Sequence, residues 1–169
     1  PMVIKAEEKR KVMLIFPGKS EKVPCKLIPL SVLSLAGPLA EAGFEPAIID
    51  QRVDENWKRK IEKVSSDAIF AGISTLTGIQ ILYAIKAAKF IRKINPKLPI
   101  VWGGVHPTLT AEQTLQNEFV NIIVRGEGEA TIVDLAKCLQ DGGNLNSVRG
   151  ISFKENGKII HNPDREFVD

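Results

Sequence analysis

Apolar residues along this chain gather in five short, nearly continuous runs, and segments with helical spacing lie between the runs. A short unbroken apolar run is typical of a parallel strand that is covered on both faces. The runs predict strands over residues 12–16, 44–49, 68–73, 99–103 and 120–124. The segments between them and after the last run predict helices over residues 30–42, 57–64, 79–94, 111–116 and 129–139.

Strands that alternate with helices in this way predict an α/β fold with a doubly wound parallel sheet. A five-stranded sheet suits the flavodoxin-like order, a Rossmann-like arrangement. Pro38 interrupts the first helical segment, which predicts a kink or an early break there. Residues 104–107 read as a polar turn, with a helix beginning at Thr108 or Thr110.

The C-terminal part of the chain differs from the rest. Two short apolar runs flank Asn156-Gly157, a dipeptide that favours a tight β-hairpin turn. We therefore expect three regions. Residues 1–10 form a disordered or tag-derived lead-in, residues 11–145 form the α/β domain, and residues 146–169 form a β-hairpin and a linker.

Composition narrows the choice of partners and compartment. The 169 residues carry 23 basic and 20 acidic side chains in dispersed positions, so we expect no nucleic-acid partner. The apolar runs are far shorter than a membrane span, and the charged N-terminus does not resemble a secretory signal. The two cysteines, Cys25 and Cys138, form no disulfide framework, which fits a cytoplasmic protein.

Small and polar residues follow each predicted strand. The carboxyl ends of parallel strands meet at one edge of the sheet, which is where open α/β sheets bind ligands. The two glycines after the fourth strand leave that edge without side chains. We expect a cofactor site made by residues that follow the third, fourth and fifth strands: Ser74, Thr75, Leu76, Thr77, Gly103, Gly104, Val105, His106, Pro107, Thr108, Arg125, Gly126 and Glu127.

Several common site chemistries have no counterpart in the sequence. It contains neither the Gly-x-Gly-x-x-Gly dinucleotide fingerprint after the first strand nor a P-loop. No metal-ligand spacing is present, so we predict no catalytic residue and no metal site made by protein side chains. We expect His106 to hydrogen-bond within its own turn, with a ligand contact or a place on a metal axis as the alternatives.

Several segments, taken in order, resemble the N-terminal cobalamin (vitamin B12)-binding domain of cobalamin-dependent radical SAM proteins. Ser74-Thr75-Leu76 is similar to the Ser-x-Leu motif of cobalamin domains, and Gly103-Gly104 is similar to their Gly-Gly motif. The helix start at residues 29–36, the turn at 104–108 and the strand end at 124–129 resemble the same subfamily. The closing hairpin and His161-Asn162-Pro163 are similar to the segment that precedes its catalytic barrel.

This resemblance implies a way of holding cobalamin. The nucleotide tail, with its dimethylbenzimidazole base, would enter a slot that Gly103 and Gly104 leave open. The Ser74 hydroxyl would face a ring nitrogen, and Thr75 and Thr77 would lie near the ribose or phosphate. The segment 125–127 would contact the tail or the corrin amides, and the helix starts at this edge would favour the phosphodiester.

Two departures from the wider family refine the expectation. The loop over residues 17–25 lacks the Asp-x-His-x-x-Gly motif of other cobalamin domains, which implies base-off binding without a protein histidine on cobalt. His106 or Cys25 stays open as a cobalt ligand. Two cysteines cannot form the Cys-x-x-x-Cys-x-x-Cys motif of radical SAM enzymes. The [4Fe-4S] cluster and S-adenosylmethionine would therefore belong to a barrel in cis, in a methyltransferase-like or related parent enzyme, and we expect no catalysis by this fragment alone.

Three alternatives stay open at the level of sequence. An FMN-binding flavodoxin-like protein needs a hydroxyl-rich loop after the first strand, where Pro17 to Ser20 supply only Ser20. A receiver-like signalling domain needs an aspartate after the third strand, where Ser74 stands. A non-catalytic scaffold domain would bind neither cobalamin nor FMN.

Overall fold

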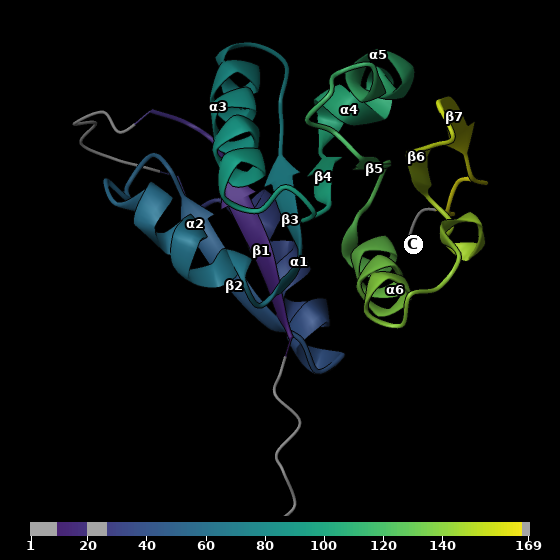
Figure 1. The fold of residues 1–169 in the computed structure, drawn as a ribbon, viewed down its shortest axis with the longest axis horizontal. Helices are drawn as coiled ribbons and strands as arrows, with labels where there is room; N and C mark the ends of the chain where they lie inside the picture. The colour runs from purple at the N-terminus through teal and green to yellow at the C-terminus, as the bar shows by residue number, and fades with distance from the viewer. Residues whose placement is uncertain (1–9, 20–26, 167–169) are drawn as a thin grey trace, which may run out of the picture.

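A computed structural model describes residues 10–19 and 27–166, which form a seven-stranded sheet in the order β2-β1-β3-β4-β5-β6-β7 (Figure 1). Five strands are parallel: β1 (Lys11–Phe16), β2 (Glu45–Asp50), β3 (Ala68–Ser74), β4 (Ile100–Gly103) and β5 (Ile122–Val124). The last two, β6 (Ile151–Glu155) and β7 (Lys158–His161), run antiparallel and extend the same sheet. The α/β class, the flavodoxin-like order and the hairpin are confirmed.

Helices cover both faces of the sheet. The helices are α1 (Leu30–Glu41), α2 (Trp57–Ser65), α3 (Ile79–Ile94), α4 (Val105–Leu109), α5 (Ala111–Leu115) and α6 (Glu129–Gln140), with a short 3₁₀ helix, η1 (Leu145–Ser147). Val12 and Leu14 of β1 point to the α1 and α6 side, whereas Met13 and Ile15 point to the α2 and α3 side. Because both faces are buried, the strands are apolar without alternation.

Two local expectations were wrong. The chain enters α4 directly at Val105, so the segment 105–107 is helical and not a polar turn. Gly104, with φ of 105°, makes the change of direction alone. Helix α1 continues through Pro38 to Glu41, so the early break does not occur. Pro38 leaves one helical hydrogen bond unformed, while buried Val32 and Leu39 hold the helix against the sheet.

The segment that we expected to be a linker packs on the domain as far as it is described. The buried Asn162 amide donates hydrogen bonds of 2.7 Å to the carbonyl oxygens of Leu145 and Val148. Arg165 donates to Thr131 Oγ1 at 3.1 Å and to Asp134. The lead-in expected over residues 1–10 lies outside the described residues except for Arg10. No helix in the described ranges is both long and apolar enough to cross a membrane.

Candidate functional site

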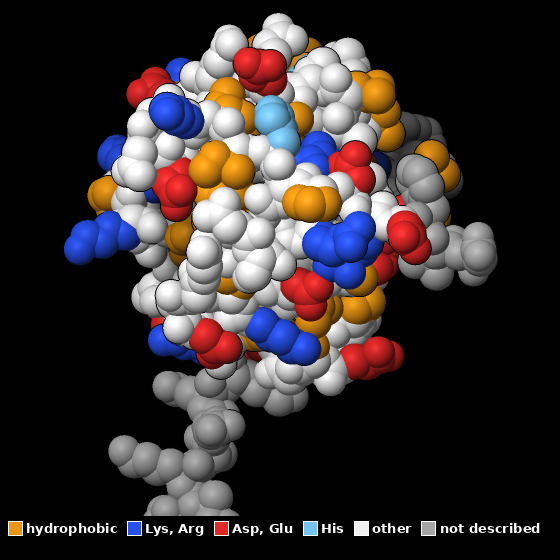
Figure 2. Space-filling model, turned by 90° about the vertical axis from the view of Figure 1, so that its right-hand side faces the viewer, with side chains coloured by type: hydrophobic (Ala, Val, Ile, Leu, Met, Phe, Trp, Pro, Cys, Tyr) orange, Lys and Arg blue, Asp and Glu red, His pale blue; other side chains and the backbone are white. Residues whose placement is uncertain are grey.

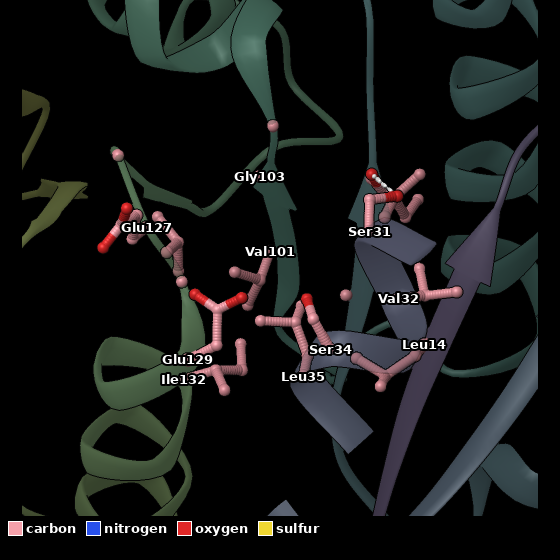
Figure 3. Close-up of a pocket in the computed structure, with 17 residues that line it drawn as sticks. Leu14, Ser31, Val32, Ser34, Leu35, Val101, Gly103, Glu127, Glu129 and Ile132 are labelled. Carbon is pink, nitrogen blue, oxygen red and sulfur yellow. Dashed lines mark hydrogen bonds between the residues drawn. The ribbon is translucent and has the colours of Figure 1, made fainter. Parts of the chain in front are cut away.

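A cavity of about 200 Å³ opens between α1 and α6 at the carboxyl ends of the parallel strands (Figure 3). Strands β1, β3, β4 and β5 supply its floor, and the first two turns of α1 and the loop from β5 into α6 with the start of α6 supply its walls. The lining residues are Leu14, Ser31, Val32, Ser34, Leu35, Gly72, Ile73, Ser74, Val101, Gly103, Gly104, Val124, Gly126, Glu127, Gly128, Glu129 and Ile132. The cavity lies at the edge that the sequence predicted for a ligand.

The floor of the cavity is apolar and contains two glycines of the central strands, Gly72 and Gly103. Val101 and Gly103 lie two positions apart in β4, so both face the α1 and α6 side. A Cβ built on Gly103 would have Val124 atoms at 3.8 Å as its nearest neighbours, so a side chain there would enter the cavity without a clash. The glycine is therefore a source of empty space at this position.

Serine hydroxyls line the wall on the α1 side. Ser74, the last residue of β3, pairs in register with Gly103 of β4, so its side chain stands beside the open glycine position. The Ser74 hydroxyl donates a hydrogen bond of 2.8 Å to Ser31 Oγ in the first turn of α1 (Figure 3). Ser34, one helical turn further along α1, also lines the cavity.

The opposite wall is the loop from β5 into α6. Thr108 of α4 holds this loop, because its Oγ1 accepts a hydrogen bond of 3.1 Å from the Gly126 amide and donates one of 2.8 Å to the Gly104 carbonyl. Figure 3 shows the Glu129 carboxylate pointing into the cavity toward Val101, whereas Glu127 points away from it. The walls therefore present hydroxyls on one side and a carboxylate on the other.

Among the described residues, the lining contains no lysine, arginine or histidine. An apolar floor with hydroxyls at one wall suits a flat aromatic group that carries a hydrogen-bond acceptor. A group with a full negative charge would face the Glu129 carboxylate, for which the described lining residues supply no compensating cation. The cavity chemistry therefore favours a neutral ligand moiety.

The structure brings only some of the expected site residues to the cavity, namely Ser74, Gly103, Gly104, Gly126 and Glu127. For Gly104 the reason differs from the expected open slot. A Cβ on Gly104 would lie 2.7 Å from the Thr75 carbonyl oxygen, and φ is 105°. Close contact between two backbones requires this glycine.

The remaining residues after β3 and β4 lie outside the cavity. Thr75 is fully buried, and its amide donates to the Gly103 carbonyl at 2.8 Å. His106 lies within hydrogen-bonding distance of Thr77 Oγ1 through Nδ1, at 3.2 Å, and of Thr110 Oγ1 through Nε2, at 3.5 Å. Of the other residues, Pro107 is buried, Thr108 supports the wall, and Leu76 and Val105 are exposed.

Arg125 faces the C-terminal segment and not the cavity. Its guanidinium donates to the carbonyl oxygens of Ile151 (2.6 Å) and Asn162 (2.5 Å), to Asp164 Oδ1 (2.7 Å) and to Ser152 Oγ. The expectation that Arg125 contacts a cofactor therefore does not fit the geometry. Arg125 therefore links the end of β5 to the C-terminal segment.

Sequence reasoning missed Ser31, Ser34 and Glu129 as cavity residues. Their signal was present, because each lies in the first or second turn of a helix that follows a strand end. Within the described ranges no group of three histidine, cysteine or acidic side chains is placed to hold a metal ion. Burial and the nearby Asp141 raise the pKa of the Cys138 thiol, which lies outside the cavity. Cys25 lies outside the described residues.

Comparisons with known proteins identify relatives of this chain. A family model of the B12 binding domain matches residues 21–136. An anaerobic magnesium-protoporphyrin IX monomethyl ester cyclase from a Synechocystis strain is 33% identical over 150 residues, which are 85% of this chain and 30% of that protein. This chain therefore spans less than a third of that relative.

Solved structures extend the comparison to three dimensions. The cobalamin-dependent S-adenosylmethionine radical enzyme OxsB, with aqua-cobalamin and S-adenosylmethionine bound, is 27% identical, with a TM-score of 0.75 over 95% of this chain and 23% of that chain. The radical S-adenosylmethionine methyltransferase TsrM from Kitasatospora setae, with cobalamin and a [4Fe-4S] cluster bound, superposes with a TM-score of 0.79 at 18% identity, covering 96% of this chain and 30% of that chain. The second likeness concerns the fold alone.

Proposed function

Since this chain belongs to the B12-binding domain family, we propose that it is the cobalamin-binding module of a cobalamin-dependent radical SAM enzyme and that the cavity receives the nucleotide tail of base-off cobalamin. The single observation that carries this proposal is the empty space beside Gly103, over an apolar floor at the strand ends. The FMN-binding and scaffold alternatives gain no support from the family match.

The residues of the cavity fit the tail of cobalamin. Leu14, Val101 and Ile132 offer apolar surface to a flat aromatic base. The paired hydroxyls of Ser74 and Ser31 stand at the rim, where one of them can donate to a ring nitrogen. A side chain in place of Gly103 would fill the space that the ring needs.

Base-off binding is consistent with the side chains near the cavity. No histidine lines it, and His106 contacts the hydroxyls of Thr77 and Thr110 elsewhere. When bound, cobalamin supplies a cobalt centre for methyl transfer or electron transfer. The residues of this chain would bind and orient the cofactor and shield its base from water.

The rest of the reaction would take place in another part of a longer protein. The compared proteins are more than three times as long as the matched region. We propose that residues 11–145 are the cofactor domain and that residues 146–169 lead toward a radical SAM barrel in cis. That barrel would hold the [4Fe-4S] cluster and S-adenosylmethionine.

The direct test is a visible absorption spectrum of the chain after mixing with hydroxocobalamin and desalting. We expect corrin bands to stay with the protein. After reduction to Co(II), the band positions should be those of base-off cobalamin, because no cavity histidine replaces the displaced base. Bands that indicate nitrogen coordination would contradict the base-off proposal, and a colourless protein would contradict cofactor binding by this chain.

A further inference from the structure

Glu129 places a charged carboxylate in the lining of a mostly apolar cavity, which the shape of the cavity alone does not explain. It is the first residue of α6, it is partly buried, and its carboxylate points into the cavity (Figure 3). Within the described part of the chain, no hydrogen bond or ion pair engages this carboxylate. The charged group therefore faces the space where the ligand tail is proposed to lie.

The chemistry of a carboxylate restricts what can cover it. At neutral pH it only accepts hydrogen bonds, and it has several lone pairs to satisfy. A ligand that removed water from Glu129 without donating a hydrogen bond would bind poorly, because a desolvated charge without a partner is costly. Within residues 10–19 and 27–166, no cation lines the cavity to act as that partner.

We propose that Glu129 accepts a hydrogen bond from a hydroxyl of the nucleotide sugar and thereby selects corrinoids that carry a nucleotide. This inference rests on the proposed function and names a specificity residue for the same site. The serine hydroxyls on the opposite wall are placed for the base, and Glu129 is placed for the neighbouring sugar. The negatively charged phosphodiester is then held away from this wall by repulsion.

A structural role for Glu129 makes a different prediction. An acidic residue in the first turn of a helix favours the helix through its macrodipole. That role would change the stability of the domain and would affect every ligand alike. Discrimination between ligands with and without the nucleotide would not follow from it.

The test measures the affinities of hydroxocobalamin and of hydroxocobinamide, which keeps the corrin ring and its amides but lacks the nucleotide. The variants are Glu129→Ala and the isosteric Glu129→Gln. The matched control is Glu112→Gln, which removes a first-turn carboxylate from α5, remote from the cavity lining. Thermal unfolding of each variant reports its stability separately.

We expect Glu129→Ala to weaken cobalamin binding by roughly ten- to a hundredfold, the effect of losing a hydrogen bond to a charged acceptor. Cobinamide binding should stay unchanged. Glu129→Gln should have an intermediate effect, because its amide oxygen still accepts but carries no charge. The Glu112→Gln control should bind both corrinoids as the parent chain does.

Each other outcome overturns a specific statement. Equal weakening of both corrinoids with a lower unfolding temperature would leave only the helix role, and equal weakening at unchanged stability would mean that Glu129 contacts a corrin amide. Unchanged cobalamin binding would mean that the Glu129 carboxylate does not contact the ligand. If the unsubstituted chain binds cobinamide as tightly as cobalamin, the tail does not occupy the cavity. If it binds neither, the proposed function itself fails. Should Glu129→Ala not fold, the isosteric Gln variant decides.

Discussion

At the scale of single residues, two neighbouring glycines carry out different tasks. Gly103 leaves empty space in the cavity, whereas Gly104 adopts a backbone conformation in close contact with Thr75. The sequence indicated that both positions need glycine. The reason for Gly104 was not predictable, because the clash comes from the backbone of another strand end.

Substitution of the two glycines by alanine should affect the stability of the domain at Gly104 and not at Gly103. Gly104→Ala should destabilise the domain by about 1–3 kcal/mol, because alanine is strained at φ of 105° and ψ of −174° and its Cβ would meet the Thr75 carbonyl. Gly103→Ala should leave stability nearly unchanged, and Gly103→Val should weaken cobalamin binding. Urea unfolding and corrinoid titration separate the two effects. Undiminished cobalamin affinity in Gly103→Val would contradict the placement of the tail.

At the scale of elements, the strength of the sequence pattern decided what was predictable. Helix α3 occupies residues 79–94 as expected, because its apolar spacing repeats over four turns. Helix α4 was missed, since five residues are too few to display a period. Proline is tolerated there because it lies in the first turn, where its missing amide hydrogen has no helical partner.

The hydrogen bonds from Arg125 at the end of β5 to the C-terminal segment were also not predicted, because their acceptors are mostly backbone carbonyls far along the chain. The Arg125 side chain is 13% exposed, whereas that of Asp164 is 81% exposed. The buried hydrogen bonds to Ile151 and Asn162 should therefore matter more than the exposed ion pair.

Arg125→Ala should cost about 2–4 kcal/mol of unfolding free energy, because it removes the donor to the Asn162 carbonyl and one of the two donors to the Ile151 carbonyl. Asp164→Ala should cost less than about 1 kcal/mol. Denaturant unfolding measures both values. Amide hydrogen exchange at Gly150 and Asn162, which bond to Pro163 and Ile151, should accelerate only in the arginine variant. Equal losses in the two variants would show that the ion pair dominates.

At the scale of the whole molecule, exposed apolar side chains are concentrated at one edge. The large exposed ones among the described residues all follow the carboxyl ends of parallel strands: Leu27, Ile28, Leu30, Leu33, Val53, Leu76, Ile79, Leu82, Val105 and Leu109. By contrast, the face seen from the side of β7 mixes basic and acidic groups with small apolar areas (Figure 2). The sequence predicted a ligand site at the edge where the cavity opens, because parallel strand ends converge there by topology. The residues that line the cavity also depend on which sides of α1 and α6 face the sheet. The hydrophobic pattern of the sequence did not predict these sides.

Serine substitutions at this edge should barely affect folding. Ile79 is 65% exposed and Leu82 is 56% exposed, so Ile79→Ser and Leu82→Ser should each change the unfolding free energy by no more than about 0.5 kcal/mol. The buried control Leu39→Ala should lose about 2–5 kcal/mol. Urea denaturation compares the three variants. A loss above about 1 kcal/mol at Ile79 would mean that the edge contributes to the folded core.

The bond between Ser31 and Ser74 has one further consequence. Each hydroxyl carries one proton, and only one of the two protons forms the bond between the serines. The pair therefore always keeps one hydroxyl that is free to donate to a ligand. Rotation of both hydroxyls reverses the direction of the bond without displacing a heavy atom, so the hydroxyl that is free to donate is then the other one, whose oxygen lies 2.8 Å away. The Ser31 and Ser74 pair can therefore donate to an acceptor at either of two positions, so it tolerates small differences in the position of a bound ligand.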